Sequence, residues 1–289
     1  MIELKETTQP SIVLFHQLLL KISEIQCRSA LNLSKIPGFE YCLNPYVGCS
    51  HGCIYCYATF MKRFRNHPEE WGSFVDVKTN LLDVLQKEVK KKRIGLVGIG
   101  TVQDAYQPIE AKYQITRQAI KMLIENNFPF EILTKSSLIV RDIDLFKGYD
   151  KACVELTLTT LDENVRKIFE PQAASVPARL KALETLIENG IETNVFFGPV
   201  IPYFSDSAEH IRKVLTKIQE IGIKRVLVDK LNYLESKISR IIQAIKDAYP
   251  QAIPYYRNIL RDQNNYKIIL RKRIKEIASN YNMSVEVLF

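Results

Sequence analysis

Three cysteines lie within eight residues of this chain, at Cys49, Cys53 and Cys56. The spacing is C-x3-C-x2-C, and Tyr55 directly precedes the third cysteine. Thiolates held this close repel one another unless a positive centre lies between them, and a metal ion or an iron–sulfur cluster supplies one. A four-iron cluster on three thiolates leaves one iron open to bind another ligand. We refer to residues 49–56 as the cysteine loop.

Two other uses of these cysteines fit the spacing less well. A structural zinc site takes four nitrogen or sulfur ligands, usually as two separated pairs, and the chain has no second C-x2-C or H-x3–5-H pair. His51 lies inside the loop, where metal binding beside two cysteine ligands would strain the backbone. Disulfides are typical of secreted proteins. The scattered Cys27, Cys42 and Cys153 are expected to pack as buried thiols, and Cys42 is the nearest candidate for a fourth ligand.

The composition is that of an ordinary globular protein. The chain has 289 residues, of which 46% are hydrophobic and 25% are charged. No run of about 18 apolar residues suggests a membrane span, and the first ten residues lack the pattern of a signal peptide. We therefore expect a cytoplasmic protein without a membrane partner. The formal net charge of +8 permits a nucleic acid or another anionic partner.

Apolar β-like runs alternate with amphipathic helical runs after the cysteine loop, which is typical of βαβ units and a parallel sheet. We expect strands in these segments: residues 94–100, 130–134, 152–158, 193–198 and 225–229. We expect helices in these segments: residues 115–127, 177–188, 207–221, 235–248 and 265–281. Residues 39–47 supply one strand before the loop, so about six strands are expected.

Six strands are fewer than the eight of a closed barrel, so the predicted fold is α/β, a partial (β/α)6 TIM-like barrel with a C-terminal helical extension. We expect an N-terminal extension over residues 1–38, the barrel over 39–232 and the helical extension over 233–289. The cysteine loop follows the first barrel strand. It therefore lies at the C-terminal edge, where parallel sheets carry their functional loops.

The cysteine loop resembles the signature of radical S-adenosylmethionine (SAM) enzymes, and its surroundings resemble the spore photoproduct lyase-like branch. The matching segments are residues 44–58, 104–110, 134–144, 157–162, 170–179 and 199–202. The resemblance implies a [4Fe–4S] cluster on Cys49, Cys53 and Cys56, with SAM chelated to the open iron. It also implies an electron donor of the flavodoxin or ferredoxin kind. One electron then splits SAM into methionine and a 5′-deoxyadenosyl radical, which abstracts a hydrogen atom from the substrate.

The resemblance also suggests residues that contact SAM. Tyr55 offers its ring or backbone to the adenine, or else it is a packing aromatic. Asp104 follows the second strand, where the family receives the SAM amino group; the usual Gly-Gly-Glu is absent, and a loop-capping role is the alternative. Lys135 follows the third strand and suits the SAM carboxylate, unless it is a surface lysine.

Three further residues are candidates for the same ligand. Thr157 and Thr159 alternate on one face of the fourth strand with Glu155. They suit the ribose hydroxyls or the carboxylate if that face is the barrel interior. Arg179 begins a helix and either pairs with the SAM carboxylate or pairs with Glu170.

The substrate and the final hydrogen donor are less constrained. Spore photoproduct lyase repairs a thymine dimer in DNA with a cysteine donor downstream of its cluster. Here Cys153 is the only cysteine after Cys56, and it begins a strand, so we do not expect lyase activity itself. Tyrosines, first Tyr106 and Tyr203, then Tyr233 and Tyr255, are the candidate donors in its place.

Three classes of function remain open at this point. The first is a radical SAM enzyme acting on a nucleic acid or nucleotide, which the basic net charge and the family resemblance both favour. The second is a radical SAM enzyme acting on a protein or a small metabolite. The third is a non-catalytic iron–sulfur protein, which would be expected to ligate all four irons, whereas the loop offers three cysteines.

Overall fold

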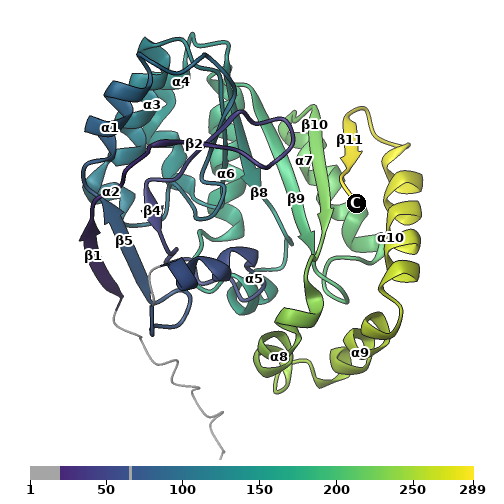
Figure 1. The fold of residues 1–289 in the computed structure, drawn as a ribbon. Helices are drawn as coiled ribbons and strands as arrows, with labels where there is room; N and C mark the ends of the chain where they lie inside the picture. The colour runs from purple at the N-terminus through teal and green to yellow at the C-terminus, as the bar shows by residue number, and fades with distance from the viewer. Residues whose placement is uncertain (1–19, 65–66) are drawn as a thin grey trace, which may run out of the picture.

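The computed structural model describes residues 20–64 and 67–289, so the expectations for residues 1–19 lie outside the described residues. Its main sheet is built from eight strands: β2 (Leu31–Leu33), β3 (Tyr41–Leu43), β6 (Val97–Ile99), β7 (Phe130–Thr134), β8 (Ala152–Thr157), β9 (Thr193–Val200), β10 (Arg225–Lys230) and β11 (Ser284–Val287). The strand order is β11-β10-β9-β8-β7-β6-β3-β2. Figure 1 shows the sheet running across the molecule.

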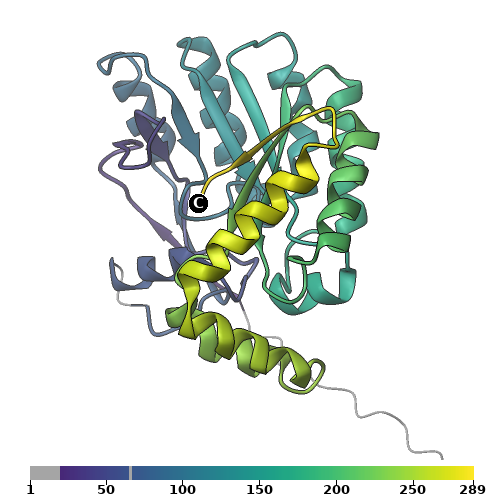
Figure 2. The same ribbon diagram turned by 90° about the vertical axis from the view of Figure 1, so that its right-hand side faces the viewer.

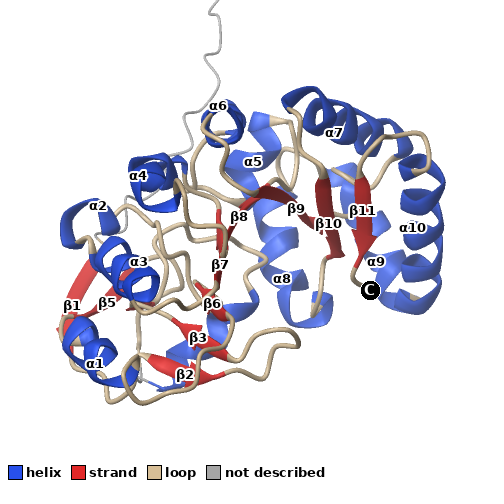
Figure 3. Ribbon diagram, turned by 90° about the horizontal axis from the view of Figure 1, so that it is seen from above, coloured by secondary structure: helices blue, strands red, loops and turns tan. Residues whose placement is uncertain are grey.

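The sheet confirms the predicted partial barrel. Seen from above, its strands form an open arc rather than a closed ring (Figure 3). The six expected strands are β3 and β6 to β10, and they pair in parallel in that order. Two edge strands were not expected. β2 pairs antiparallel with β3, and β11 pairs in parallel with β10.

A second, three-stranded sheet lies beside the barrel. It consists of β1 (Lys21–Ile25), β4 (Tyr46–Val47) and β5 (Phe74–Lys78), in the order β1-β5-β4. β4 directly precedes the cysteine loop, so this small sheet supports the start of the loop. The segment expected as an N-terminal extension thus contributes β1 to this sheet and β2 to the main sheet.

Helices connect the strands. The α-helices are α1 (Leu81–Glu88), α2 (Glu110–Tyr113), α3 (Ile115–Glu125), α4 (Ile143–Phe146), α5 (Glu163–Phe169), α6 (Val176–Glu188), α7 (Ala208–Ile221), α8 (Leu234–Ile245), α9 (Ile253–Arg261) and α10 (Gln263–Ala278). The 3₁₀ helices are η1 (Tyr57–Phe64), η2 (Ser137–Asp142) and η3 (Pro250–Ala252). Ser175 and Ser207 cap α6 and α7 by accepting backbone N–H groups.

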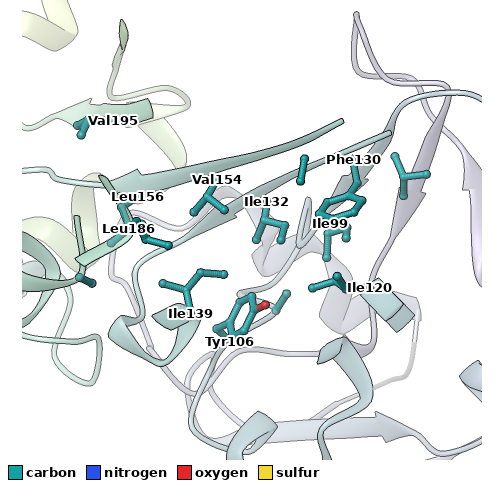
Figure 4. Close-up of a cluster of buried hydrophobic side chains, with 14 of the residues drawn as sticks. Ile99, Tyr106, Ile120, Phe130, Ile132, Ile139, Val154, Leu156, Leu186 and Val195 are labelled. Atoms are coloured by element: carbon teal, nitrogen blue, oxygen red, sulfur yellow. The ribbon is translucent and has the colours of Figure 1, made fainter. Parts of the chain in front are cut away.

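The strands bury one face against the helices. Successive side chains of a strand point to opposite faces, and alternate residues such as Ile99, Phe130, Ile132 and Val154 share one buried cluster with Ile120 of α3 (Figure 4). Each of these side chains is at most 1% exposed. The other face of the same strands forms the concave side of the arc, and it carries the polar residues Glu131, Glu155 and Asn194.

The C-terminal segment is mostly helical, as expected, and α9 and α10 run across one side of the molecule (Figure 2). Asp206, which precedes α7, fastens these helices because its carboxylate accepts hydrogen bonds from Tyr255 at 2.8 Å and Tyr266 at 3.0 Å. The last residues differ from the expectation because they return to the sheet as β11. In the described part of the chain, no helix is long and apolar enough to cross a membrane.

Candidate cofactor site

Close backbone packing fixes the start of the cysteine loop. Gly48 has a φ of 84°, and a Cβ there would lie 2.4 Å from the Phe74 carbonyl oxygen. The close contact with β5 therefore requires a glycine at this position. The Gln107 side chain accepts the Ser50 N–H at 2.8 Å and donates to the Gly48 carbonyl at 3.2 Å. The loop is therefore held from both sides before any ligand binds.

The three thiols lie at the C-terminal edge of the sheet, as predicted. Cys49 and Cys53 are 7% and 6% exposed. Burial raises the pKa of the Cys53 thiol to about 12, and burial followed by the charges of Asp104 and the other two cysteines raises that of Cys49. Iron must therefore displace protons when it binds. Within residues 20–64 and 67–289, no group of three His, Cys, Asp or Glu side chains is placed to hold a single metal ion. A [4Fe–4S] cluster is a larger body whose thiolates bind separate irons.

Asp104 joins the cysteine loop to two strands. Its carboxylate accepts hydrogen bonds from the Thr134 hydroxyl at 2.7 Å and the Lys135 N–H at 2.8 Å, and it lies 3.3 Å from Nδ1 of His51. Burial alone would raise the pKa of Asp104, but the neighbouring His51 and the hydrogen bonds from Lys135 and Thr134 together outweigh burial and lower the pKa. Asp104 is thus ionised and partnered within the protein.

Lys135 points toward the cysteines from the end of β7. Its Nζ lies 5.8 Å from the centre of the Tyr55 ring. Burial would lower the pKa of Lys135, but the charges of Cys53, Glu170 and Asp104 outweigh it and raise the pKa. No hydrogen bond or ion pair of the Nζ atom occurs among the described residues, so this cation is available to an anionic group.

Glu170 and Arg179 form a buried ion pair behind the loop. Arg179 is 1% exposed and donates to Glu170, and it also donates to the Thr157 carbonyl at 3.1 Å. The other Glu170 oxygen accepts the hydroxyl of Tyr55. Of the two roles considered for Arg179, pairing with Glu170 is present in the structure, and Tyr55 is anchored by the same carboxylate.

Several buried polar atoms near the cysteines have no hydrogen-bond partner in the described structure. Besides Nδ1 of His51, which lies 3.3 Å from Asp104, they are Oγ of Ser50, Nε2 of Gln103 and Oγ1 of Thr157 and Thr159. Thr157 is fully buried and belongs to the concave face, because its neighbour Leu156 lies in the core on the other face. We call these four residues, with Lys135 and the three cysteines, the cysteine pocket. Unpartnered hydroxyls and amides beside a free cation fit a polar, carboxylate-bearing ligand such as SAM.

The structure separates the two first candidate hydrogen donors. Tyr106 is fully buried in the main hydrophobic cluster (Figure 4), and its hydroxyl donates to Asp142 at 3.0 Å. This placement argues against Tyr106 as a hydrogen-atom donor, because its hydroxyl is already hydrogen-bonded within the core. Tyr203 follows β9, is 38% exposed and stacks edge-on against Phe204 and Tyr255.

Cys153 faces the concave side near the N-terminal end of β8. Its sulfur accepts a hydrogen bond from Asn194 Nδ2 at 3.1 Å, and burial followed by nearby carboxylates raises its pKa. It lies four positions before Thr157 of the cysteine pocket on the same strand.

The sequence did not predict the roles of His51 and Gln107. It also did not predict that Glu170 anchors Tyr55. Gln107 lies in the Asp104–Glu110 segment that carries the family resemblance, which was the available signal. The contact between Tyr55 and Glu170 joins residues 115 positions apart. No local pattern predicts it.

The model of the radical SAM superfamily matches residues 43–228. The chain belongs to the radical SAM superfamily. Its cofactors are accordingly a [4Fe–4S] cluster and SAM, and the three cysteines of the loop with their unpartnered polar neighbours fit them.

Relatives of this radical SAM protein occur in archaea, bacteria and viruses. An uncharacterized protein of Methanocaldococcus jannaschii is 42% identical over 188 residues, which is 65% of this chain and 70% of the relative. An uncharacterized protein of Mycobacterium bovis is 30% identical and covers 90% of this chain and 81% of its own length. A radical SAM Nalpha-GlyT isomerase of Pseudomonas phage M6 is 25% identical over 64% of this chain and 38% of its own length.

Solved structures share the fold. Spore photoproduct lyase complexed with dinucleoside spore photoproduct superposes with a TM-score of 0.68 at 14% identity, covering 93% of this chain and 82% of the lyase. A lyase variant with bound SAM and the same ligand gives a TM-score of 0.67 at 13% identity, with 93% and 82% coverage. The fold is therefore that of the lyase-like branch, as the sequence resemblance implied.

Proposed function

We propose that this radical SAM protein abstracts a hydrogen atom from a nucleic acid or nucleotide. The observation that carries the chemistry is the cysteine pocket, in which two buried thiols and the partly buried thiol of Cys56 lie beside polar atoms that lack partners. When bound, the cluster and SAM supply a radical that removes a hydrogen atom from the substrate. The protein's part is to bind the cofactors, orient SAM and keep water out.

The proposed roles follow from the position of each residue. Cys49, Cys53 and Cys56 hold the cluster. Lys135 neutralises the SAM carboxylate, because its ammonium group points toward the cysteines and has no hydrogen bond or ion pair among the described residues. Thr157 and Thr159 give their free hydroxyls to SAM.

Three other candidates, Asp104, Arg179 and Tyr55, act indirectly in this proposal, through contacts within the protein. Asp104 holds Lys135 in place, because the Lys135 N–H donates to its carboxylate at 2.8 Å. Arg179 fixes Glu170, and Glu170 in turn fixes Tyr55 beneath the Lys135 cation. These residues set the geometry of the pocket. In this proposal, an electron donor of the flavodoxin or ferredoxin kind reduces the cluster.

Two observations support a nucleic-acid substrate over a protein or metabolite. The net charge of +8 suits a polyanion. A protein of the same fold, spore photoproduct lyase, has been solved with a dinucleoside ligand. Cys153, the one cysteine after the loop, lies at the opposite end of β8 from Thr157, which argues for a reaction other than photoproduct repair.

An anaerobic assay tests this proposal. The reconstituted protein is mixed with dithionite, SAM and one of four pools: DNA, RNA, peptides or small metabolites. We expect release of 5′-deoxyadenosine, stimulated by a nucleic-acid pool. Stimulation by the peptide or metabolite pool alone would reject the substrate class, and methylthioadenosine in place of 5′-deoxyadenosine would reject the chemistry.

A further inference from the structure

Two helices lie side by side at the exit of the cysteine loop. η1 begins at Tyr57, directly after Cys56, and α8 follows β10 at the same edge of the sheet. The Lys237 ammonium of α8 donates to the Thr59 hydroxyl of η1 at 2.7 Å, which joins the two helices. In Figure 1, α8 lies at the lower end of the molecule, where β9 and β10 end.

The exposed face of η1 carries two aromatic rings and then a cation. A 3₁₀ helix has three residues per turn, so every third side chain falls in one row about 6 Å apart. This row contains Tyr57, Phe60 and Arg63. The rings of Tyr57 and Phe60 are 49% and 41% exposed with centres 6.5 Å apart. Arg63 is exposed and has no carboxylate partner among the described residues.

An aromatic ring and two cations also lie along α8. Tyr233 directly precedes the helix with a left-handed backbone, Lys237 is buried where it meets Thr59, and Arg240 is partly buried three residues later. Tyr233 is 70% exposed, and Arg240 has no carboxylate partner in the described parts of the chain. The acidic residue of the first turn, Glu235, is on another face and accepts a hydrogen bond from Gln263.

η1 lies beside the cysteines, because it begins directly after Cys56. Tyr57 donates its hydroxyl to the Thr101 carbonyl, while its ring stays half exposed. The hydrogen bond between Lys237 and Thr59 places α8 next to this helix, so the ring of Tyr233 and the cations Arg63 and Arg240 lie on two adjoining segments.

Aromatic rings beside a cation match the two parts of a single-stranded nucleic acid. Unpaired bases stack on aromatic side chains, and arginine and lysine bind the phosphates. A duplex hides the faces of its bases, so exposed rings would gain nothing from it. We propose that η1 and α8 hold an unpaired stretch of nucleic acid, with bases on Tyr57 and Tyr233 and phosphates on Arg63 and Arg240. This inference rests on the nucleic-acid substrate proposed above and adds the form of that substrate.

Binding of labelled oligonucleotides to the reconstituted protein tests the inference. Fluorescence anisotropy is measured with a fluorescein-labelled 20-nucleotide single strand, as DNA and as RNA, and with the matched duplex. We expect at least one single strand to bind more tightly than the duplex. Tyr233→Ala should weaken single-strand binding roughly 5- to 150-fold, which corresponds to the stacking of one base. Tyr233→Trp, which keeps a stacking surface, should restore it.

The cations give a second, independent signature. Arg240→Ala and Arg63→Ala should each flatten the slope of log affinity against log salt by about 0.7, as expected for one lost contact with a single-strand phosphate. Ile268→Ala and Lys272→Ala remove an exposed apolar side chain and an exposed cation from α10 and should leave affinity and slope unchanged. Thermal melting of each variant checks that it is folded.

The outcomes separate the two proposals. If the wild-type protein binds single strands but the Tyr233 and Arg240 variants bind them equally well, the role of η1 and α8 is overturned and the proposed function stands. Equal binding of duplex and single strand also overturns the role. If no oligonucleotide binds and no nucleic-acid pool stimulates 5′-deoxyadenosine release, the proposed substrate class fails as well.

Discussion

Two groups of buried polar side chains in this molecule differ in how many of their polar atoms have a hydrogen-bond partner. In the first, the ion network, Glu110 and Asp142 are fully buried and accept hydrogen bonds from Arg117 and Arg141. Two tyrosine hydroxyls complete it. In the second, the cysteine pocket, four polar side chains, Thr157 among them, have an atom without a partner.

A buried polar atom without a partner costs about 1–3 kcal/mol. A chain selected only for stability would fill such a site with an apolar side chain or supply a partner. The ion network does the latter, which indicates a structural role. The cysteine pocket does neither, which indicates that a ligand supplies the missing partners. Substitutions in the two groups should therefore have opposite signatures, one in stability and the other in cofactor binding.

The largest expected effect is in the pocket. Cys53→Ala should abolish cluster assembly, because the remaining two thiolates cannot hold three irons. The broad absorption near ~400 nm that iron–thiolate bonding gives and the release of 5′-deoxyadenosine should both disappear. Cys27→Ala, which removes a partly buried thiol outside the pocket, serves as the control. A Cys53→Ala protein with a full complement of iron would refute the ligand assignment.

The next effect is in the ion network and appears in stability. Glu110→Gln keeps the shape of the side chain but removes the charge that pairs with Arg141 at 2.9 Å. We expect a loss of about 2–4 kcal/mol in the free energy of unfolding, near the range for breaking a buried ion pair. Urea denaturation measures it. Glu125→Gln, at an exposed position of α3, should change stability by less than about 0.5 kcal/mol. Similar losses for both variants would show that the network is not structural.

Lys135→Ala should change SAM binding rather than stability. It removes the unpartnered cation of the pocket, so we expect SAM to bind more weakly by about 1–3 kcal/mol, the contribution of a charge-assisted hydrogen bond. Equilibrium dialysis with labelled SAM on the cluster-loaded protein gives the affinity. The exposed Lys147→Ala is the matched control. Unchanged SAM affinity would remove Lys135 from the pocket.

The sequence predicted the parts of this comparison that depend on neighbours in the chain. The six parallel strands are short, mostly apolar runs, and the three cysteines can be identified from their spacing alone. β2 and β11 were missed because a three- or four-residue edge strand such as Ser284–Val287 is defined by its partner. The state of each polar atom could not be predicted either. Whether Arg179 faces Glu170 or a ligand depends on how segments distant in the chain pack together.

A smaller effect depends on pH and tests the concave face below the pocket. Burial, followed by the neighbouring charge of Glu131, raises the pKa of Glu155 from its ordinary 4.5 to about 7. Because the folded state holds this proton more tightly than the unfolded state, wild-type stability contains a term that is lost as pH rises from about 4.5 through 7.

The Glu155→Gln variant lacks this term. Its stability relative to the wild type should rise by about 1–2 kcal/mol between pH 4.5 and pH 8, below the limit of about 3 kcal/mol that the shift in pKa allows. Denaturation curves at both pH values measure the change. Glu192→Gln, at an exposed position beside the same strands, is the control. A constant difference between Glu155→Gln and the wild type would show that Glu155 titrates normally.

The smallest effect compares the same substitution in both groups. Thr116 lies at the ion network, is fully buried and donates its hydroxyl to the Ala105 carbonyl at 2.7 Å, whereas Thr157 is equally buried and has no partner for its hydroxyl. Thr116→Val should lower the free energy of unfolding by about 1 kcal/mol or more, because it leaves a buried acceptor unpaired. Thr157→Val should leave stability unchanged or slightly raised and should weaken SAM binding by about 1 kcal/mol. Equal losses of stability in the two variants would mean that the Thr157 hydroxyl has a partner within the protein. At this residue, the cysteine pocket would then not differ from the ion network.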